Sequence, residues 1–224
     1  MFIRKQYSSH ITEGENKQGG KRGIKMAKLH FKYGAMNSGK SDTLIKTAYN
    51  YIERGLSIVT IKPSIDTKGD TLIVARGGAE REVDIIATPD MDIRQAVQSF
   101  KKSHQIDVLS CVLIDEAQFL TVDQVDQLLS VAKADNISVI AYGLRADFKT
   151  QLFPGSKRLL ETADNIEKLP TMCRCGNQAE FNCRKIDGAY VFEGQQVAID
   201  GEQAITYDSL CGTCYLTEKA AVHA

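Results

Sequence analysis

The chain has 224 residues, 28 basic and 28 acidic side chains, and a hydrophobic fraction of 43%. This composition is typical of a globular protein and excludes wholesale disorder, a collagen-like repeat or a coiled-coil rod. No apolar run approaches the roughly 18 residues that a membrane span requires, and a net charge of zero argues against nucleic-acid binding as the main role.

Residues 1–25 are polar and lack the apolar centre of a secretory signal. Met26 stands immediately before the first patterned segment, so we interpret residues 1–26 as a flexible N-terminal extension or the product of an upstream start codon. Without an export signal the expected location is cytoplasmic, where thiols stay reduced. The six cysteines then need an explanation other than disulfides.

Strand-like and helix-like segments alternate along the chain from residue 28. The apolar patterns predict strands at residues 28–33, 57–61, 83–87, 110–114 and 137–142. Helical spacing predicts helices at residues 42–54, 92–103 and 121–134. The Gly-rich, charged segment at residues 66–82 predicts a mobile loop. Strands that alternate with helices imply parallel crossovers and therefore a doubly wound α/β sheet.

One segment between a predicted strand and a predicted helix fits the phosphate-binding pattern G-x-x-x-x-G-K-S/T. Its glycines let the backbone aim N–H groups at phosphate oxygens, and the positive end of the following helix adds to the attraction. Lys40 would bridge the β- and γ-phosphates, and the Ser41 hydroxyl would bind Mg²⁺. The predicted nucleotide-binding residues, called the phosphate loop below, are Gly34, Ala35, Met36, Asn37, Ser38, Gly39, Lys40 and Ser41.

An acidic pair, Asp115 and Glu116, follows the apolar strand at residues 110–114. An acid at this place in phosphate-loop proteins holds Mg²⁺, which makes Asp115 the candidate. Glu116 lies at the carboxyl edge of the sheet and could take a proton from water, as in an ATPase, or from a substrate hydroxyl, as in a kinase. Asp66 follows the second strand and would either join the Mg²⁺ shell or cap its loop.

The cysteines near the C-terminus form two close pairs, Cys173 with Cys175 and Cys211 with Cys214. In a reducing compartment such pairs predict a structural Zn²⁺ site with four thiolate ligands. Cys183 is an alternative ligand to Cys173, and a reversible disulfide is the alternative chemistry.

The character of the sequence changes near residue 168, where helical patterning fades. Short strand-like pieces follow at residues 179–184, 189–192 and 196–199. We predict a nucleotide-binding α/β domain at residues 27–167, a zinc-binding domain at residues 168–220 and a tail at residues 221–224. The cysteine pairs would tie both ends of residues 176–210, and a loop tethered beside a nucleotide site is a candidate lid that excludes water.

The motifs occur together in one order: YGAMNSGKS, KPSIDT, CVLIDEAQF, YGLRADFKTQLF, C-x-C, EGQQVAIDG and YDSLCGTCY. In this order they closely resemble the bacterial form of the cytosolic thymidine kinase family. The resemblance covers about residues 27–215. It implies an α/β phosphate-loop NTPase core with a mostly parallel sheet and a small C-terminal zinc-bound lasso domain.

The resemblance implies transfer of the γ-phosphoryl group of ATP to the 5′-hydroxyl of thymidine, with Asp115 in the Mg²⁺ shell and Glu116 as the general base. Ala117 and Gln118, which follow this pair, would belong to the same ATP and Mg²⁺ site. The nucleoside-binding residues that it implies are Met36, Phe119, Leu144, Phe148, Phe153 and Tyr207. For each of these side chains the alternative is ordinary core packing.

The resemblance also implies a homotetramer and feedback inhibition by dTTP, with no nucleic-acid or membrane partner. The main rival is a phosphate-loop ATPase whose zinc ribbon grips nucleic acid. That function requires a basic face, whereas residues 176–210 contain two basic and six acidic side chains. A third class, a nucleotide sensor without chemistry, gives Glu116 no role.

Overall fold

The computed structural model describes residues 26–196 and 204–222, and its largest element is a six-stranded sheet. The strand order is β5-β2-β6-β7-β1-β8, and every neighbouring pair is parallel. The strands are β1 (Leu29–Tyr33), β2 (Ser57–Pro63), β5 (Ile85–Ala87), β6 (Leu109–Ile114), β7 (Ser138–Gly143) and β8 (Asn165–Lys168). The predicted α/β class with a parallel sheet is confirmed.

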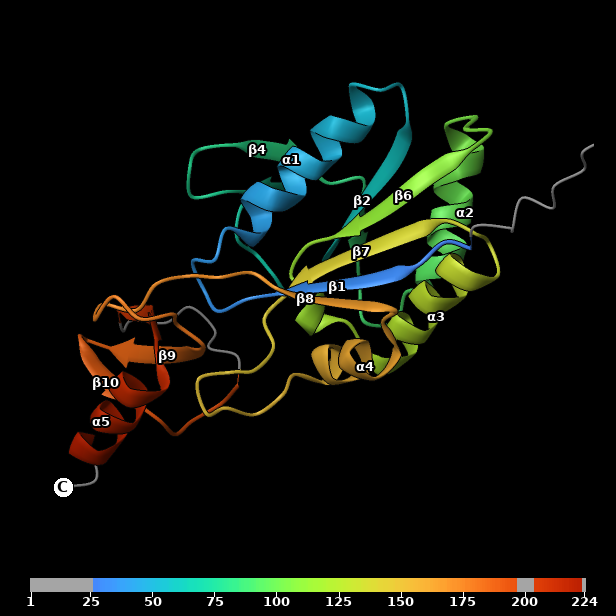
Figure 1. Ribbon diagram of the computed structural model, residues 1–224. Coiled ribbons are helices and arrows are strands. Elements are labelled where there is room, and N and C mark those ends of the chain that lie inside the picture. Colours follow the sequence, from blue (N-terminus) through green and yellow to red (C-terminus); the bar gives the residue numbers. More distant parts are fainter. Residues whose placement is uncertain (1–25, 197–203, 223–224) are drawn as a thin grey trace, which may run out of the picture.

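Helices cover both faces of this sheet (Figure 1). Helix α1 packs on one face, and α2, α3 and α4 pack on the other. Their bounds are α1 (Lys40–Ile52), α2 (Ile93–Ser103), α3 (Val122–Lys133) and α4 (Pro154–Thr162), and a short 3-10 helix η1 (Ala117–Phe119) follows β6. Because successive strand residues point to opposite faces, Leu113 of β6 packs in the cluster under α1, and Ile114 packs in the cluster under α2 to α4.

Side chains cap the beginnings of two helices. The Asp92 carboxylate accepts a hydrogen bond of 2.8 Å from the Gln95 backbone N–H at the start of α2. Thr121 and Gln124 form a reciprocal capping box at the start of α3. Because these side chains satisfy backbone donors that a helix leaves open, they fix where each helix begins.

The prediction of a mobile loop throughout residues 66–82 was wrong. Within this segment, β3 (Leu72–Val74) and β4 (Glu80–Glu82) form an antiparallel hairpin. Ile73 is 1% exposed and packs with Leu44 of α1 and with Val83, which anchors the hairpin on the sheet domain. The dense glycines and charges of this segment concealed a three-residue apolar strand. Helix α4 and strand β8 were likewise absent from the predicted elements.

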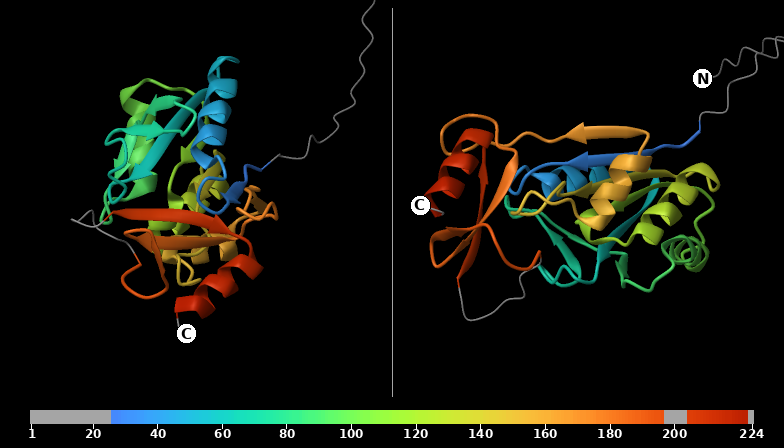
Figure 2. Two further views of the ribbon diagram at one scale, coloured as in Figure 1. Left: turned by 90° about the vertical axis from the view of Figure 1, so that its left-hand side faces the viewer. Right: turned by 90° about the horizontal axis from the view of Figure 1, so that it is seen from below.

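The C-terminal part of the chain forms a separate small unit (Figure 2). It contains an antiparallel sheet of order β10-β9-β11 and one helix. The elements are β9 (Phe181–Ile186), β10 (Ala189–Val191), β11 (Ile205–Leu210) and α5 (Gly212–Val222). Helix α5 extends two residues into the segment that we predicted as a tail. Gln196 is not in a strand, and the rest of the strand predicted at 196–199 lies outside the described residues.

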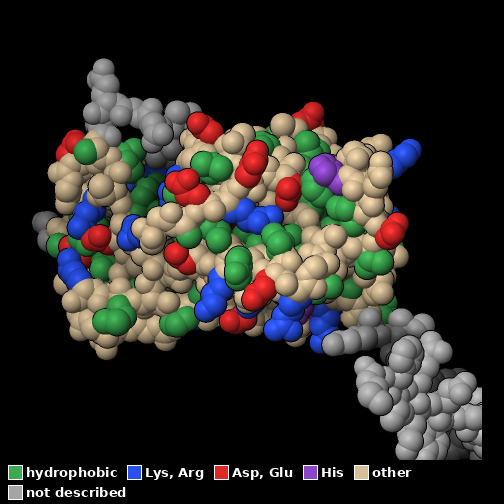
Figure 3. All heavy atoms as spheres, turned by 90° about the horizontal axis from the view of Figure 1, so that it is seen from above, with side chains coloured by type: hydrophobic (Ala, Val, Ile, Leu, Met, Phe, Trp, Pro, Cys, Tyr) green, Lys and Arg blue, Asp and Glu red, His purple; other side chains and the backbone are tan. Residues whose placement is uncertain are grey.

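Figure 1 places this small unit beyond the carboxyl ends of β1 and β7, the edge where parallel sheets bind ligands. Basic and acidic side chains are interspersed on the face seen in Figure 3, in keeping with the net charge of zero. Among the described residues no helix is both long enough and apolar enough to cross a membrane. The predicted N-terminal extension, apart from Met26, lies outside the described residues.

Candidate active site

The phosphate loop joins β1 to α1, in the strand–loop–helix order that the motif requires. Gly39 adopts a left-handed backbone conformation (φ 72°) at the start of α1. A Cβ atom on Gly34 would lie 2.3 Å from Ser38 Oγ and 2.9 Å from the Leu169 carbonyl oxygen. Only glycine fits at position 34, because the loop turns back closely against the chain that leaves β8.

A cavity of about 190 Å³ lies at this loop. The charged residues that line it are Lys40, Asp42, Lys68, Arg76 and Glu116, and Met36 and Ser41 are among the uncharged ones. Lys40 is 7% exposed, and its ammonium donates a 3.1 Å hydrogen bond to the Ala35 carbonyl. Burial lowers the pKa of Lys40, and the nearby Glu116 and Asp115 carboxylates act in the opposite direction. The cavity therefore combines the cationic side chains of Lys40, Lys68 and Arg76 with the start of α1, a combination that suits phosphate groups.

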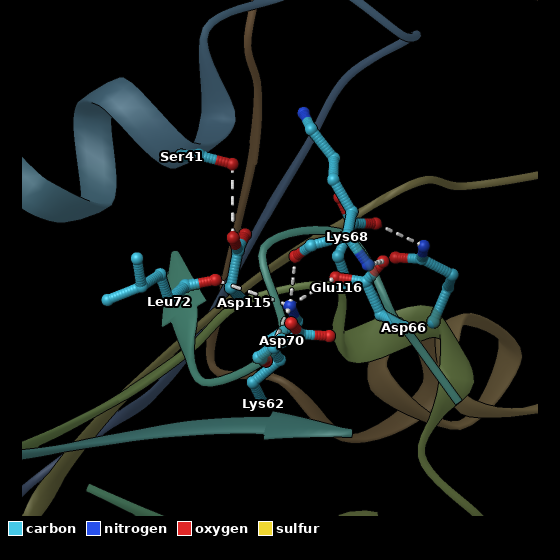
Figure 4. A network of polar contacts seen from close by, with 9 residues as sticks. Ser41, Lys62, Asp66, Lys68, Asp70, Leu72, Asp115 and Glu116 are labelled. Carbon is cyan, nitrogen blue, oxygen red and sulfur yellow. Dashed lines mark hydrogen bonds and ion pairs between the residues drawn. The ribbon is translucent and has the colours of Figure 1, made fainter. Parts of the chain in front are cut away.

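Asp115 lies at the carboxyl end of β6 and is 4% exposed (Figure 4). Its Oδ2 accepts a 3.0 Å hydrogen bond from the Ser41 hydroxyl, whereas its Oδ1 is buried without a hydrogen-bond partner among the described residues. Burial, with a contribution from Glu116, raises the pKa of Asp115 to about 7. An unpartnered carboxylate oxygen beside a serine hydroxyl is a donor set that suits Mg²⁺, so these residues fit the predicted ion.

Glu116 begins η1 in a left-handed conformation (φ 48°), which non-glycine residues rarely adopt. Its carboxylate accepts a hydrogen bond from the side-chain amide of Gln118. Gln118 is 1% exposed, and its Oε1 accepts a 2.9 Å hydrogen bond from the Leu144 backbone N–H. The sequence assigned Gln118 to the ATP and Mg²⁺ site, and the structure places it between the acid and the segment after β7, where it orients the Glu116 carboxylate.

Two side chains of the small unit form hydrogen bonds to the phosphate loop, and no sequence pattern indicated either of them. Asn182 of β9 accepts a 2.8 Å hydrogen bond from the Met36 backbone N–H and donates one of 2.8 Å to the Ala146 carbonyl. The Ser209 hydroxyl of β11 donates to the Met36 carbonyl. Because Asn182 and Ser209 are more than 140 residues from Met36 in sequence, only tertiary structure brings them to the phosphate loop.

The predicted nucleoside-binding side chains fall into three groups. Phe119 and Phe153 meet edge to face, with ring centroids 5.7 Å apart. Phe148 and Tyr207 are bridged by Arg184, a residue that sequence reasoning missed. The remaining two, Met36 and Leu144, line the cavity at the phosphate loop.

Arg184 is 4% exposed, and its guanidinium lies 3.9 Å from the centroid of the Phe148 ring. Its Nε donates a 3.0 Å hydrogen bond to the Tyr207 hydroxyl. The other guanidinium nitrogens donate to the carbonyls of Gln195 and Gln196. Arg184 therefore connects β11 and residues 195–196 to the segment after β7.

The four predicted cysteine ligands come together in the small unit. The Sγ atoms of Cys173, Cys175, Cys211 and Cys214 all lie within 4.8 Å of one another. Burial opposes ionisation of Cys173, but backbone N–H groups of Cys175 and Cys211 lower its pKa to about 6. Four thiols at this spacing are compatible with a tetrahedral zinc site.

The geometry also separates Cys183 from the four cysteines whose sulfur atoms lie together. Cys183 is fully buried, and this burial raises the pKa of its thiol to about 12. It lies outside the group of sulfur atoms, which contains Cys173 instead. Cys183 is therefore a core residue of the small unit, packed with Leu210 and Tyr215.

Comparison with known proteins gives consistent matches over most of the chain. A family model described as thymidine kinase matches residues 27–215. The thymidine kinase of Enterobacteria phage T4 is 45% identical over 188 residues, which are 83% of this chain and 94% of the relative. The thymidine kinase of Legionella pneumophila (strain Philadelphia 1) is 44% identical over 200 residues, 88% of this chain and 93% of the relative. That of Shewanella oneidensis is 40% identical over 188 residues, 83% and 95% of the two chains.

Proposed function

This chain belongs to the thymidine kinase family, and we propose that it transfers the γ-phosphoryl group of ATP to the 5′-hydroxyl of thymidine, forming dTMP. Membership makes it a kinase, a phosphotransferase. The choice of ATP as donor, the residues that carry the reaction and the bound ions belong to the proposal. The observation that supports it most is that Glu116 lines the same cavity as Lys40 and Ser41.

Phosphoryl transfer depends mainly on positioning and on neutralisation of charge. In the proposal the phosphate loop binds the phosphates through its backbone N–H groups, and Lys40 turns from the Ala35 carbonyl toward the β- and γ-phosphates. Ser41 and Asp115 would hold Mg²⁺, with Asp66 in the surrounding shell. Mg²⁺, when bound, supplies positive charge that offsets the charge on the phosphate oxygens.

Glu116 has the role of general base. As the O5′–P bond forms and the bond from the γ-phosphorus to the bridging oxygen breaks, ADP leaves with that oxygen and the 5′-hydroxyl proton passes to the Glu116 carboxylate. The hydrogen bond from Gln118 holds this carboxylate at the cavity. Because Asp115 is already engaged with Ser41, the two neighbouring acids have separate tasks.

The nucleoside site in this proposal lies between the sheet domain and the small unit. Phe119 and Phe153 would pack along the thymine ring, and Met36 and Leu144 would line the side toward the phosphates. Phe148 and Tyr207, held by Arg184, would complete the wall. Met36 bonds to Asn182 and Ser209 of the small unit, and Arg184 of the small unit contacts Phe148, which supports a substrate bound at the boundary.

The cysteine group would hold one structural Zn²⁺ through Cys173, Cys175, Cys211 and Cys214. Four ligands leave no open position, so this ion would stabilise the fold without acting on substrate. A cytoplasmic location, a homotetramer and inhibition by dTTP complete the proposal. These three rest on the family resemblance alone.

The rival function, a nucleic-acid-dependent ATPase with a zinc ribbon, is not favoured. The family match and the names of the relatives point to thymidine kinase. The basic side chains of β9 are also engaged, since Arg184 is buried and Lys185 pairs with Asp208 at 2.6 Å. A nucleic-acid-binding face needs basic groups that are free to meet phosphates.

The variant Glu116→Gln tests the proposed base. It keeps the size of the side chain and removes the proton acceptor, so we expect ATP binding to persist while kcat falls by about 10²- to 10⁴-fold. ATP consumption should be measured with thymidine, with deoxycytidine and without nucleoside. Asp123→Asn, at an exposed position of α3, is the matched control and should keep normal turnover. Nearly unchanged turnover of Glu116→Gln would exclude Glu116 as the base.

A further inference from the structure

Lys62 is a buried charged residue to which the proposed mechanism gives no role. It occupies the penultimate position of β2, and its side chain is 1% exposed. It points to the same face of the sheet as Ile58, which packs in the cluster under α1. Burying a lysine side chain is costly unless its charge is paired and its N–H groups find acceptors.

The acceptors of Lys62 all belong to one short segment, residues 66–72 (Figure 4). The Nζ atom donates to the backbone carbonyls of Lys68, Asp70 and Leu72, the last two at 3.3 Å. It also lies 3.1 Å from Oδ2 of Asp66. Alternate carbonyls of the segment thus converge on one nitrogen, and the chain is wrapped around the Lys62 side chain.

This arrangement makes the shape of the segment dependent on Lys62. Gly69 and Asp70 adopt left-handed conformations (φ 75° and 49°), which the segment reaches as it turns its carbonyls inward. Without the lysine these carbonyls would face a buried region with no donor at its centre, and an unpaired buried carbonyl is unfavourable. The segment would then rearrange to hydrate them.

The same segment supplies one side chain that lines the phosphate cavity, Lys68, and one carboxylate near enough to act on Asp115, that of Asp66. The Asp66 carboxylate is held through both oxygens, by Lys62 at Oδ2 and by the Lys68 backbone N–H at Oδ1 (3.3 Å). The Lys68 carbonyl faces Lys62, whereas its side chain extends away from Lys62 in Figure 4 and lines the cavity. The position of Lys62 therefore sets where an anionic and a cationic group stand beside Asp115 and Glu116.

We propose that Lys62 is a positioning residue for phosphoryl transfer. Its ammonium group holds residues 66–72 in the conformation that presents Asp66 and Lys68 to bound Mg·ATP. It does not touch the nucleotide itself. The inference rests on the proposed function, because it assigns Lys62 a role at the same phosphate site. It predicts weaker binding of the metal–nucleotide complex with no change in thymidine binding.

The test uses the full chain with Lys62→Met, which keeps the apolar stem, and Lys62→Arg, which keeps a cation of different shape. Lys102→Met, at an exposed position of α2, is the matched control. KM for ATP, the Mg²⁺ concentration for half-maximal rate and KM for thymidine are measured for each. Calorimetric titration with Mn²⁺ and ATP in the absence of thymidine provides a readout that does not require turnover.

For Lys62→Met we expect about 10- to 100-fold weaker Mn·ATP binding, and a rise of the same size in the Mg²⁺ requirement, with KM for thymidine nearly unchanged. Lys62→Arg should show a smaller shift in the same direction. Amide hydrogen exchange at residues 66–72 should become faster in both variants while the protection of β6 and β7 is retained. Lys102→Met should match the parent protein in every measurement.

Three results would overturn this role. The first is normal metal–nucleotide binding in a folded Lys62→Met variant. The second is an equal loss at the thymidine end, which would indicate general damage to the fold. The third is failure of both variants to fold, which would make Lys62 a structural core residue only. Failure of the proposed function is separate, because the parent protein would then lack thymidine-dependent consumption of ATP whatever stands at position 62.

Discussion

The sheet domain and the small C-terminal unit are stabilised in different ways. In the sheet domain, buried aliphatic side chains from β1, β2, β6 and β7 pack against helices on both faces. In the small unit the buried cluster contains few residues, and three of them are the cysteines Cys173, Cys183 and Cys211. A unit of this size has little apolar surface to bury, so its fold depends on additional bonds, which a metal held by four thiolates would supply.

This difference matters for function because the proposed site lies where the two units meet. Asn182 and Ser209 of the small unit bond to Met36 in the phosphate loop of the sheet domain. Arg184 of the small unit packs on the ring of Phe148 in the sheet domain. In the proposed function the sheet domain would supply the phosphate site, and the small unit would complete the site for the second substrate.

Removal of a metal bound by the four cysteines should produce the largest difference between the two units. Chelation, or Cys175→Ser, is expected to remove up to about 10–16 kcal/mol of apparent stabilisation and to unfold the small unit while the parallel sheet persists. Metal analysis measures the zinc content, hydrogen exchange reports the folding of each unit, and a thymidine kinase assay measures activity. Cys111→Ala, a change to a buried thiol of β6, is the control and should retain about one Zn²⁺ per chain. Full activity of a metal-free sample would contradict this view.

A mutation that creates a cavity in the sheet domain should destabilise that domain and leave the small unit unaffected. Leu128 of α3 is fully buried in the larger cluster. Leu128→Ala is expected to reduce the free energy of unfolding of the sheet domain by about 2–5 kcal/mol, because the packing around the deleted carbons relaxes only in part. Denaturant unfolding measures this loss, and zinc content should not change. Loss of zinc at temperatures where the variant is folded would show that the two units are not independent.

A mutation at the contact between the two units should have the smallest and most local effect. Asn182→Ala removes both hydrogen bonds to the sheet domain and leaves the Met36 N–H and the Ala146 carbonyl without this partner. We expect a loss of about 1–3 kcal/mol in stability, and faster amide exchange at the phosphate loop, with zinc content unchanged. Asn165→Ala on the exposed side of β8 serves as the matched control. Equal exchange at Met36 in both variants would refute the coupling.

Much of the phosphate site was predictable because its signals are local. Gly34, Gly39 and Lys40 follow one strand and begin one helix, and Asp115 follows the apolar run of another strand. Since parallel strands end at a common edge, sequence order alone predicts that these groups meet. The Asn182 and Arg184 contacts carry no such signal, because β9 lies in a different sheet and its partners are distant in sequence.

The hairpin and Lys62 show the limit of local patterns most clearly. Glycines and charges at residues 66–82 predict a loop, but Ile73 finds an apolar surface on α1, and Lys62 supplies the donors that fold residues 66–72 inward. Spacing also left Cys183 open as an alternative to Cys173. Only the three-dimensional positions of the sulfur atoms distinguish a ligand from a core residue.

Local sequence patterns predict the parallel α/β class, the loop that precedes α1, the acidic pair after β6 and the two cysteine pairs, because each depends on neighbours within a few residues. Tertiary structure decided which cysteine joins the cluster, how the small unit is fastened to Met36 and what surrounds the Lys62 side chain. These features depend on hydrogen bonds and burial between segments that are distant in the chain, and no local pattern encodes such distances.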